Sequence, residues 1–414
     1  VRLFMDALFP LLVNQEMAAA EGQRTQLVRF SFLILVAAVV AIAVKIVGVL
    51  LLNLGGPRKS EDVAPFLYNL FMDPAIIDIP LKGRLRHLVA SLISRLRAKK
   101  VGDDYRRVDP SGGSLINALT EEQAAALEQQ LNRRFAKEEV TFRTFIAMRY
   151  WHPLSEEAEE AMREAGVTKL VLLPLYPHYS KTTTGASLVY WKELENEGVV
   201  ATRPTTYVQE YATHPAYLAS LSRRIDEGLA RFPEQVRDDV HILFSAHGTP
   251  TKEMTERRDP YCCHIHSTIW RLLATRNEQR GSSVAFQSKV GPAEWLQPST
   301  PDKIEKLAAG GVHNLLVVPI AFVTDHIETA YELAIEVKEE AMEAGIERYE
   351  VTGGLNTDPD FIDALVDVTG QQLRYDGASL IEGGIGWSER ERYDAAERDL
   401  RCVQCERVGE ACRW

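Results

Sequence analysis

The sequence predicts an α/β protein made of two related halves, each with a parallel β-sheet flanked by helices. Three observations predict this class. Short apolar segments rich in β-branched residues alternate with amphipathic segments from residue 46 onward, a pattern typical of parallel sheets with crossover helices. The segment 166–188 resembles 311–333, and the segment 47–57 resembles 241–250. The chain has 414 residues, which is enough for one large domain or two medium ones.

Each predicted strand is a short continuous apolar run that ends at polar or turn-forming residues. The strands cover 46–54, 141–148, 169–176, 241–245, 283–287 and 314–322. Because apolar runs without alternation are buried on both faces, they predict inner strands of parallel sheets. The predicted helices show apolar residues at the helical period, and they cover 61–72, 82–99, 120–136, 154–166, 214–232, 264–277, 301–310, 328–344 and 359–372.

The N-terminal extension, residues 1–45, precedes the first predicted strand. Its uncharged segment 30–44 is shorter than the roughly 20 apolar residues that a spanning helix needs. Three interpretations stay open: a membrane anchor, a non-native or mis-started extension, and a cleaved signal. We divide the rest into a first domain at 46–205, a second at 206–385 and a tail at 386–414.

Composition excludes two classes of protein. The net charge is −11 and no strongly basic stripe appears, so we expect no nucleic acid partner. Five cysteines are too few for a disulfide scaffold in a chain of this length. Cys262 and Cys263 are adjacent, whereas Cys402, Cys405 and Cys412 lie together near the end of the sequence.

Polar side chains follow two of the predicted strands. The segment "FVTDHIETAYE" (322–332) delivers Asp325, His326, Glu328 and Glu332 directly after strand 314–322, and "LFSAHGTP" places His247 after strand 241–245. Ligands bind outside the carboxyl ends of strands in open α/β sheets. Because histidine exchanges its proton near neutral pH, these residues predict a site for a cation or for proton transfer, in a cleft between the two halves.

Several motifs together resemble the ferrochelatase family, whose members insert ferrous iron into a porphyrin to make haem. They occur in family order from about residue 46 to 372 and are "LLNLGGP", "RYWHPL", "LYPHYSKTTTGASL", "FSAHGTP", "QSKVGPAEWLQP" and "VVPIAFVTDHIETAYEL". The resemblance implies a chelatase fold of two Rossmann-like halves with the active-site cleft between them. It also implies ferrous iron and protoporphyrin IX as substrates. Alternative reactions are the insertion of iron into coproporphyrin and of cobalt into a corrin precursor. The alternative to an enzyme is a non-catalytic porphyrin or iron–sulfur sensor protein.

The resemblance implies the site residues position by position. His247 matches the catalytic histidine and Glu328 the conserved acid, and Asp325 and His326 of the same motif are expected to join them in binding the substrate iron. Two pyrrole N–H protons must leave as the metal enters, so a general base is needed and His247 is our candidate. The expected porphyrin-binding residues are Leu54, Arg107, Arg149, Tyr150, Tyr261 and Trp295.

One stretch departs from the family pattern. The sequence reads "YRRVDPSGGSL", with a longer spacer than usual and Leu115 where proline is common, which puts the role of Arg107 in doubt. The stretch 71–80 matches a flexible lip of the family. We expect a cytoplasmic protein that contacts a membrane surface, such as the inner membrane, through this lip or through 30–44.

The cysteines at the end of the sequence have the spacing C-x2-C-x6-C. Three thiolates are one short of the four that an iron–sulfur cluster or a zinc site takes. The resemblance implies a [2Fe–2S] cluster held by Cys402, Cys405 and Cys412, with Cys262 or Cys263 as the fourth ligand. Zinc and uncoordinated thiols are the alternatives.

Overall fold

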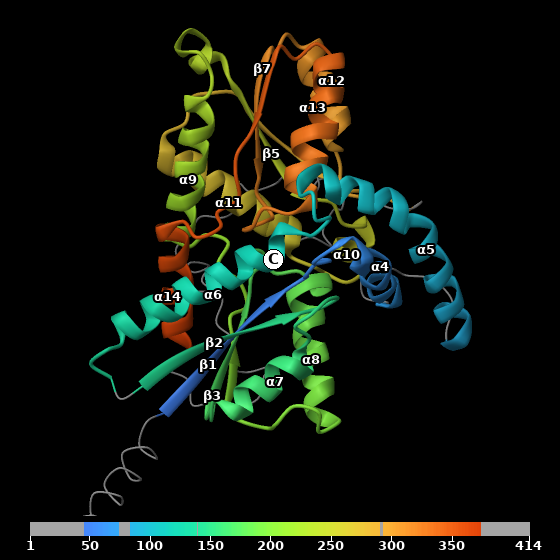
Figure 1. Cartoon of the computed structure of the whole chain (residues 1–414). Coiled ribbons are helices and arrows are strands. Elements are labelled where there is room, and N and C mark those ends of the chain that lie inside the picture. Colours follow the sequence, from blue (N-terminus) through green and yellow to red (C-terminus); the bar gives the residue numbers. More distant parts are fainter. Residues whose placement is uncertain (1–44, 74–82, 139, 290–292, 374–414) are drawn as a thin grey trace, which may run out of the picture.

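The computed structural model describes residues 45–73, 83–138, 140–289 and 293–373. It contains two four-stranded parallel sheets (Figure 1). The first sheet has the order β2-β1-β3-β4, and the second has the order β6-β5-β7-β8. Their strands are β1 (Lys45–Asn53), β2 (Val140–Met148), β3 (Lys169–Pro174), β4 (Thr205–Tyr207), β5 (His241–His247), β6 (Ser282–Gln287), β7 (Asn314–Pro319) and β8 (Arg348–Val351). The predicted α/β class is therefore confirmed.

The inner strands carry the apolar runs that predicted them. Strand β1 has seven consecutive buried residues, and β7 is buried from end to end. Strand β1 lies between β2 and β3, and β7 lies between β5 and β8, so both faces of each are covered. Side chains from both sheets, including Val49, Phe142 and Phe244, share one hydrophobic core cluster.

The internal repeat is visible in the structure. Both sheets have the same strand order, with the third strand of each half ending at a proline, Pro174 or Pro319. A π-helix follows each of these strands, η2 (Lys181–Gly185) in the first half and η4 (Glu328–Glu336) in the second. Such helices occur frequently at functional sites.

The predicted helices are present with shifted ends. They are α4 (Val63–Met72), α5 (Gly83–Val108), α6 (Leu115–Arg134), α7 (Ser155–Glu164), α9 (Pro215–Ala230), α11 (Tyr261–Arg276), α12 (Thr300–Ala309), η4 continuing into α13 (Val337–Glu343), and α14 (Pro359–Gln372). Helix α14 follows the second sheet but packs on α6 and α9 (Figure 1). In the described part of the chain, no helix is both long and apolar enough to cross a membrane.

Several short elements are absent from the prediction. The edge strands β4 and β8 span three and four residues, too few to show an apolar pattern. The same holds for α10 (Thr251–Thr255) and for the 3₁₀ turns η1 (Ser60–Asp62) and η3 (Glu234–Asp239). Helix α8 (Ala186–Asn196) was also missed. The boundary predicted at 205/206 falls within β4 (Thr205–Tyr207), so we propose that it lies after this strand, between residues 208 and 214.

Candidate active site

His247 and Glu328 lie together at the carboxyl ends of two neighbouring strands. His247 is the last residue of β5, and Glu328 opens the π-helix η4 that follows β7. Strands β5 and β7 are paired, so the topology brings both side chains to one edge of the sheet. His247 Nδ1 lies 3.0 Å from Glu328 Oε2, with 38% of the histidine side chain and 22% of the glutamate side chain exposed.

A serine joins this pair to a second carboxylate. Ser288 follows β6, which pairs with β5 on its other side. Its hydroxyl lies 3.1 Å from Glu328 Oε2 and 2.7 Å from Glu332 Oε2, and its backbone N–H donates to Glu332 Oε1. Ser288 has a φ of +62°, a conformation uncommon for a residue with a side chain. The four residues form a continuous hydrogen-bonded group.

The imidazole and the carboxylate shift each other's pKa. Burial lowers the pKa of His247, but the charge of Glu328, its hydrogen bond and the charge of Glu332 raise it, and the net shift is upward. Burial raises the pKa of Glu328, whereas the charge and hydrogen bond of His247, with smaller contributions from His326 and Ser288, lower it to about 2. Glu328 is therefore ionised at neutral pH.

The second carboxylate behaves differently. Burial and the charge of Glu328 raise the pKa of Glu332 to about 7, despite the hydrogen bonds from Ser288. Glu332 can therefore gain or lose a proton near neutral pH, while Glu328 stays charged. Carboxylates with pKa values pushed apart in this way are typical of sites that move protons.

The hydrogen bond also sets the tautomer of His247. An ionised carboxylate only accepts hydrogen bonds, so Nδ1 of His247 carries the proton that points to Glu328. When the ring is neutral, its lone pair is on Nε2. His247 is thus oriented to accept a proton at Nε2, on the side of the ring away from Glu328.

Asp325 and His326 flank the pair but face other partners. Asp325 accepts hydrogen bonds from the Gly354 N–H and from the Asn356 side chain. His326 is 5% exposed, and its Nδ1 lies 3.1 Å from the Thr324 carbonyl oxygen. Burial lowers the pKa of His326, more than Glu328 raises it. Among the described residues, no three His, Cys, Asp or Glu side chains form a group that could hold a metal ion.

Two site residues were not predicted from the sequence. Ser288 lay unmarked in the "QSKVGPAEWLQP" motif, because a single serine gives no sequence signal. Phe322 was marked only as part of a strand, yet its ring lies between two histidines, 6.0 Å from that of His247 and 4.3 Å from that of His326. Glu332 was noted in the sequence as one of four clustered polar residues, without an assigned role.

Arg149 and Tyr150 share one buried partner. Asp73 Oδ2 accepts from Arg149 Nε at 3.1 Å, from Arg149 Nη2 at 2.9 Å and from the Tyr150 hydroxyl at 2.8 Å. The Arg149 guanidinium also lies 4.0 Å from the Tyr190 ring centroid. Tyr150 is 3% exposed and belongs to a hydrophobic cluster that Leu54 joins at its border. Two of the predicted porphyrin-binding residues therefore already form an internal ion-pair and hydrogen-bond set.

The other predicted porphyrin-binding residues lie around His247 and η4. The Tyr261 hydroxyl donates to the His247 carbonyl oxygen at 3.0 Å. The partly buried Trp295 packs so closely over Gly248 that a Cβ there would lie 3.1 Å from the indole. Arg107 is exposed at the end of α5, and its Nη1 donates to the Tyr331 hydroxyl on η4 at 3.1 Å. Tyr331 ties the first half of the chain to the π-helix that carries Glu328.

The two body cysteines differ in accessibility. Cys262 is 1% exposed and sits in the main hydrophobic core, whereas Cys263, the next residue on α11, is partly exposed. Cys402, Cys405 and Cys412 lie outside the described residues, as do segment 30–44 and most of the lip at 71–80. Of these two cysteines, Cys263 is therefore the more accessible.

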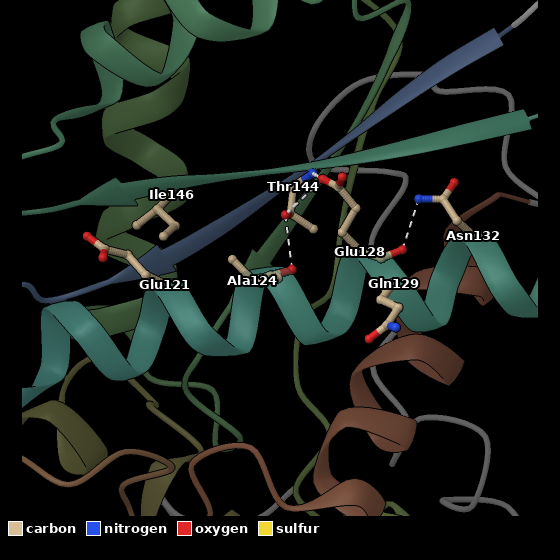
Figure 2. Close-up of a pocket in the computed structure, with 8 residues that line it drawn as sticks. Glu121, Ala124, Glu128, Gln129, Asn132, Thr144 and Ile146 are labelled. Atoms are coloured by element: carbon tan, nitrogen blue, oxygen red, sulfur yellow. Dashed lines mark hydrogen bonds between the residues drawn. The ribbon is translucent and has the colours of Figure 1, made fainter.

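A surface groove of about 460 Å³ lies elsewhere, between α6 and the edge strand β2 (Figure 2). Its lining includes Glu128, Asn132 and Thr144 but none of the predicted site residues. Glu128 accepts from the Thr144 N–H, and Asn132 bonds both backbone groups of Phe142. These side chains occupy the hydrogen-bonding groups of an edge strand, so the groove is explained by the fold.

The two parallel sheets and the acid–base pair at the carboxyl edge of the second sheet have the features of an α/β chelatase. Residues 46–373 match the family model for ferrochelatase. The chain belongs to the ferrochelatase family. Residues 1–53 also match the model of the ABC 3 transport family, a match that overlaps β1.

Similar ferrochelatases agree with this assignment. The chain is 43% identical to a ferrochelatase of Trichodesmium erythraeum (strain IMS101), over 79% of this chain and 82% of the relative. It is 44% identical to a ferrochelatase of Geotalea uraniireducens (strain Rf4), over 77% of this chain and 96% of the relative. Among solved structures, SirB from Bacillus subtilis with Fe3+ has a TM-score of 0.46 at 11% identity, covering 84% of this chain and 98% of that one.

Family membership gives the activity. The protein is a metal-inserting enzyme of haem synthesis that places ferrous iron in a porphyrin. Ferrous iron is a substrate of this reaction. The alternative of a sensor without turnover is therefore set aside.

Proposed function

We propose that His247 is the general base that removes the pyrrole protons, and that Glu328 orients it. The observation that carries this proposal is the 3.0 Å contact between His247 Nδ1 and Glu328 Oε2 at the carboxyl edge of the second sheet. It leaves Nε2 free to take a proton from a ring nitrogen. When His247 becomes an imidazolium, the ionised Glu328 stabilises its charge.

Glu332 is proposed as the next proton acceptor. Metal insertion releases two protons, and a single imidazole holds only one of them at a time. The Ser288 hydroxyl bridges Glu328 and Glu332, and the pKa of Glu332 is about 7. A proton can therefore pass along this group toward Glu332, whose carboxylate has nearly equal tendency to hold or release it at neutral pH.

Iron approaches the same group in this proposal. The two glutamates offer carboxylate oxygens on one side of His247, and the imidazole offers Nε2 on the opposite side of its ring. Ferrous iron that sheds part of its water shell needs such anionic and imidazole groups along its path. The roles of Asp325 and His326 as iron ligands stay predictions, since both side chains are bonded to the surrounding fold.

Arg107 is the propionate-binding residue that we favour. It is exposed, and a neutral phenol, Tyr331, is its hydrogen-bond partner on η4. Arg149 is less suited because Asp73 already neutralises it in a largely buried setting. Trp295 offers apolar surface for the macrocycle beside His247, and Leu54 offers it at the end of β1. Tyr261 holds the His247 backbone through its carbonyl oxygen. Tyr150 holds the Asp73 carboxylate.

We propose protoporphyrin IX as the porphyrin substrate and protohaem as the product. The support is the cysteine tail, which resembles that of ferrochelatases with a [2Fe–2S] cluster. Coproporphyrin, which carries four propionates in place of two, is the main alternative. In an anaerobic assay with ferrous iron, we expect kcat/KM for protoporphyrin to exceed that for coproporphyrin by at least about tenfold, or about 1.4 kcal/mol. The reverse preference would reassign the substrate.

Helix α5 supports the proposed contact with a membrane surface. Four of its leucines lie on one face and are exposed by 52–72%: Leu85, Leu88, Leu92 and Leu96. Residues 83–102 contain six Arg or Lys and no Asp or Glu, although the whole chain has a net charge of −11. An apolar stripe edged by basic residues suits the boundary of an anionic bilayer. A protein that handles apolar porphyrins benefits from such a location.

A vesicle-binding experiment tests this contact. We expect Leu88→Gln/Leu92→Gln to bind anionic vesicles at least tenfold more weakly than the parent chain. Each change removes apolar area that would be buried in the bilayer on binding, and burying one leucine side chain fully is worth about 1.5–3 kcal/mol. Met342→Gln is the matched control, since Met342 is 47% exposed on α13. Equal binding by the double variant and the control would remove α5 from the membrane contact.

We also propose that the tail binds a [2Fe–2S] cluster. Its ligands would be Cys402, Cys405 and Cys412, completed by Cys263 because Cys262 is buried in the core. We expect the anaerobically purified protein to show cluster absorption in the visible range, and Cys263→Ser to lose most of it. Cys262→Ser is the matched control. A full signal in Cys263→Ser would exclude this ligand.

A further inference from the structure

The carboxylate of Asp325 is hydrogen-bonded to the loop that follows β8. Its Oδ1 accepts from the Gly354 N–H at 2.9 Å and from the Thr329 hydroxyl at 3.3 Å. Its Oδ2 accepts from Asn356 Nδ2 at 2.8 Å. Both oxygens therefore bind within the protein, and each interaction fixes the turn at which η4 begins.

Asn356 pairs with Asp325 in both directions. While its Nδ2 donates to the carboxylate, its Oδ1 accepts from the backbone N–H of Asp325 at 3.1 Å. Its backbone N–H donates to the Val323 carbonyl oxygen. Asn356 has a φ of +49°, in the left-handed region that asparagine tolerates better than most residues. The conformation and the side-chain bonds together select asparagine at this position.

The pair is also anchored to the first half of the chain. The carbonyl oxygen of Asn356 accepts from Nε2 of Gln123 at 2.8 Å. Gln123 lies on α6 and is fully buried. The turn that starts η4 is thus held between a loop of the second half and a helix of the first.

Glu328 depends on this turn for its position. Thr329, the residue after it, donates to Asp325 and accepts from the His326 N–H at 3.0 Å. Residues 325–329 therefore form one hydrogen-bonded unit that contains Glu328. A movement of the Asp325–Asn356 pair would shift Glu328 relative to His247 and change their 3.0 Å contact.

We propose that Asp325 and Asn356 are positioning residues for Glu328, and that Asp325 is not an iron ligand. This inference rests on the proposed role of the His247–Glu328 pair. It replaces the expectation from the sequence that Asp325 binds the substrate iron. The carboxylate that the sequence predicts as an iron ligand instead holds the first turn of η4 in place.

Exchanging the two side chains separates these roles. In Asp325→Asn/Asn356→Asp, the new amide can donate to the new carboxylate, and its oxygen can accept from Gly354 and Thr329. The new carboxylate can accept from the backbone N–H at 325. All four bonds are available again, but the charge at 325 is gone. In Asp325→Asn alone, two amide NH2 groups face each other and neither accepts a hydrogen bond. In Asn356→Asp alone, two carboxylates face each other and repel.

We expect each single variant to lower kcat by about ten- to 100-fold with little change in the KM for porphyrin, because a small displacement of a catalytic group costs this much. The exchanged double variant should recover to within about threefold of the parent chain. If it stays as slow as Asp325→Asn, the carboxylate at 325 acts directly and the inference is wrong.

Two further measurements keep the outcome clear. Asn356→Gly keeps the left-handed backbone but removes the side chain, so we expect a loss in kcat similar to that of Asn356→Asp at a melting temperature near that of the parent. A wild-type kcat in Asn356→Gly would also overturn the inference. The parent chain is assayed alongside, because an inactive parent would count against the proposed function rather than against the positioning role.

Discussion

We expect His247→Ala to lose iron insertion by about 10²- to 10⁴-fold, the usual contribution of a positioned general base. The pyrrole protons would then have no acceptor at the edge of the second sheet. Because 38% of the histidine side chain is exposed, its removal should leave the fold intact. The measurement is the rate of metalloporphyrin formation under anaerobic conditions, with the melting temperature as a check on folding.

His241→Ala is the matched control for this variant. His241 lies at the opposite end of the same strand, where it bonds to Ser283. We expect near-normal turnover from it. Turnover by His247→Ala within about threefold of the parent would remove His247 as the base, whatever the control shows.

The second large effect is expected for Glu328→Gln. The neutral amide keeps the shape of the side chain but no longer stabilises an imidazolium, so we expect kcat to fall about 100-fold. Its pH dependence should change as well. Glu328 raises the pKa of His247, so in the parent chain the neutral base is lost as pH falls through this raised pKa.

In Glu328→Gln the main cause of that upward shift is gone, while burial still lowers the pKa of His247. The acid limb of the pH–rate profile should therefore move to lower pH. Glu339→Gln is the control, since Glu339 is an exposed acid on α13. An acid limb that stays in place would show that the titrating group of the parent is not His247.

The inner strands and the long helices could be predicted because their sequence patterns are local. Strand β1 is apolar over most of its length and lies at the middle of its sheet, as its composition indicates. The edge strands β4 and β8 carry no such signal, since their pairing with β3 and β7 is decided by contacts made far along the chain. Local patterns also gave no sign that η2 and η4 are π-helices.

The site was predictable only in part. His247 and Glu328 stand 81 residues apart, yet each follows a recognisable strand, so their meeting at one sheet edge could be expected. The hydrogen-bond and ion-pair partners of the other site residues could not be predicted. Arg149 reads as a free cation in the sequence, and only the fold brings Asp73 to it from 76 positions away. Asp325 and Asn356 meet in the same way, although η4, α13 and β8 lie between them in the sequence.

Two hydrogen bonds link the halves of the chain beside the proposed site. Arg107 and Gln123, both from the first half, bond to η4 and to the loop beside it. The residues proposed to act on the porphyrin nitrogens are thereby held relative to those proposed to bind the ring. Rigid placement of this kind keeps the base within reach of a proton on a planar substrate.

A crystal structure of the protein with metal-free porphyrin, grown without iron, tests the central claim most directly. The account predicts that the macrocycle lies with a pyrrole nitrogen about 3 Å from His247 Nε2, within hydrogen-bonding reach, while Nδ1 keeps its contact with Glu328. A porphyrin bound where neither His247 nor Glu328 faces its nitrogens would contradict it.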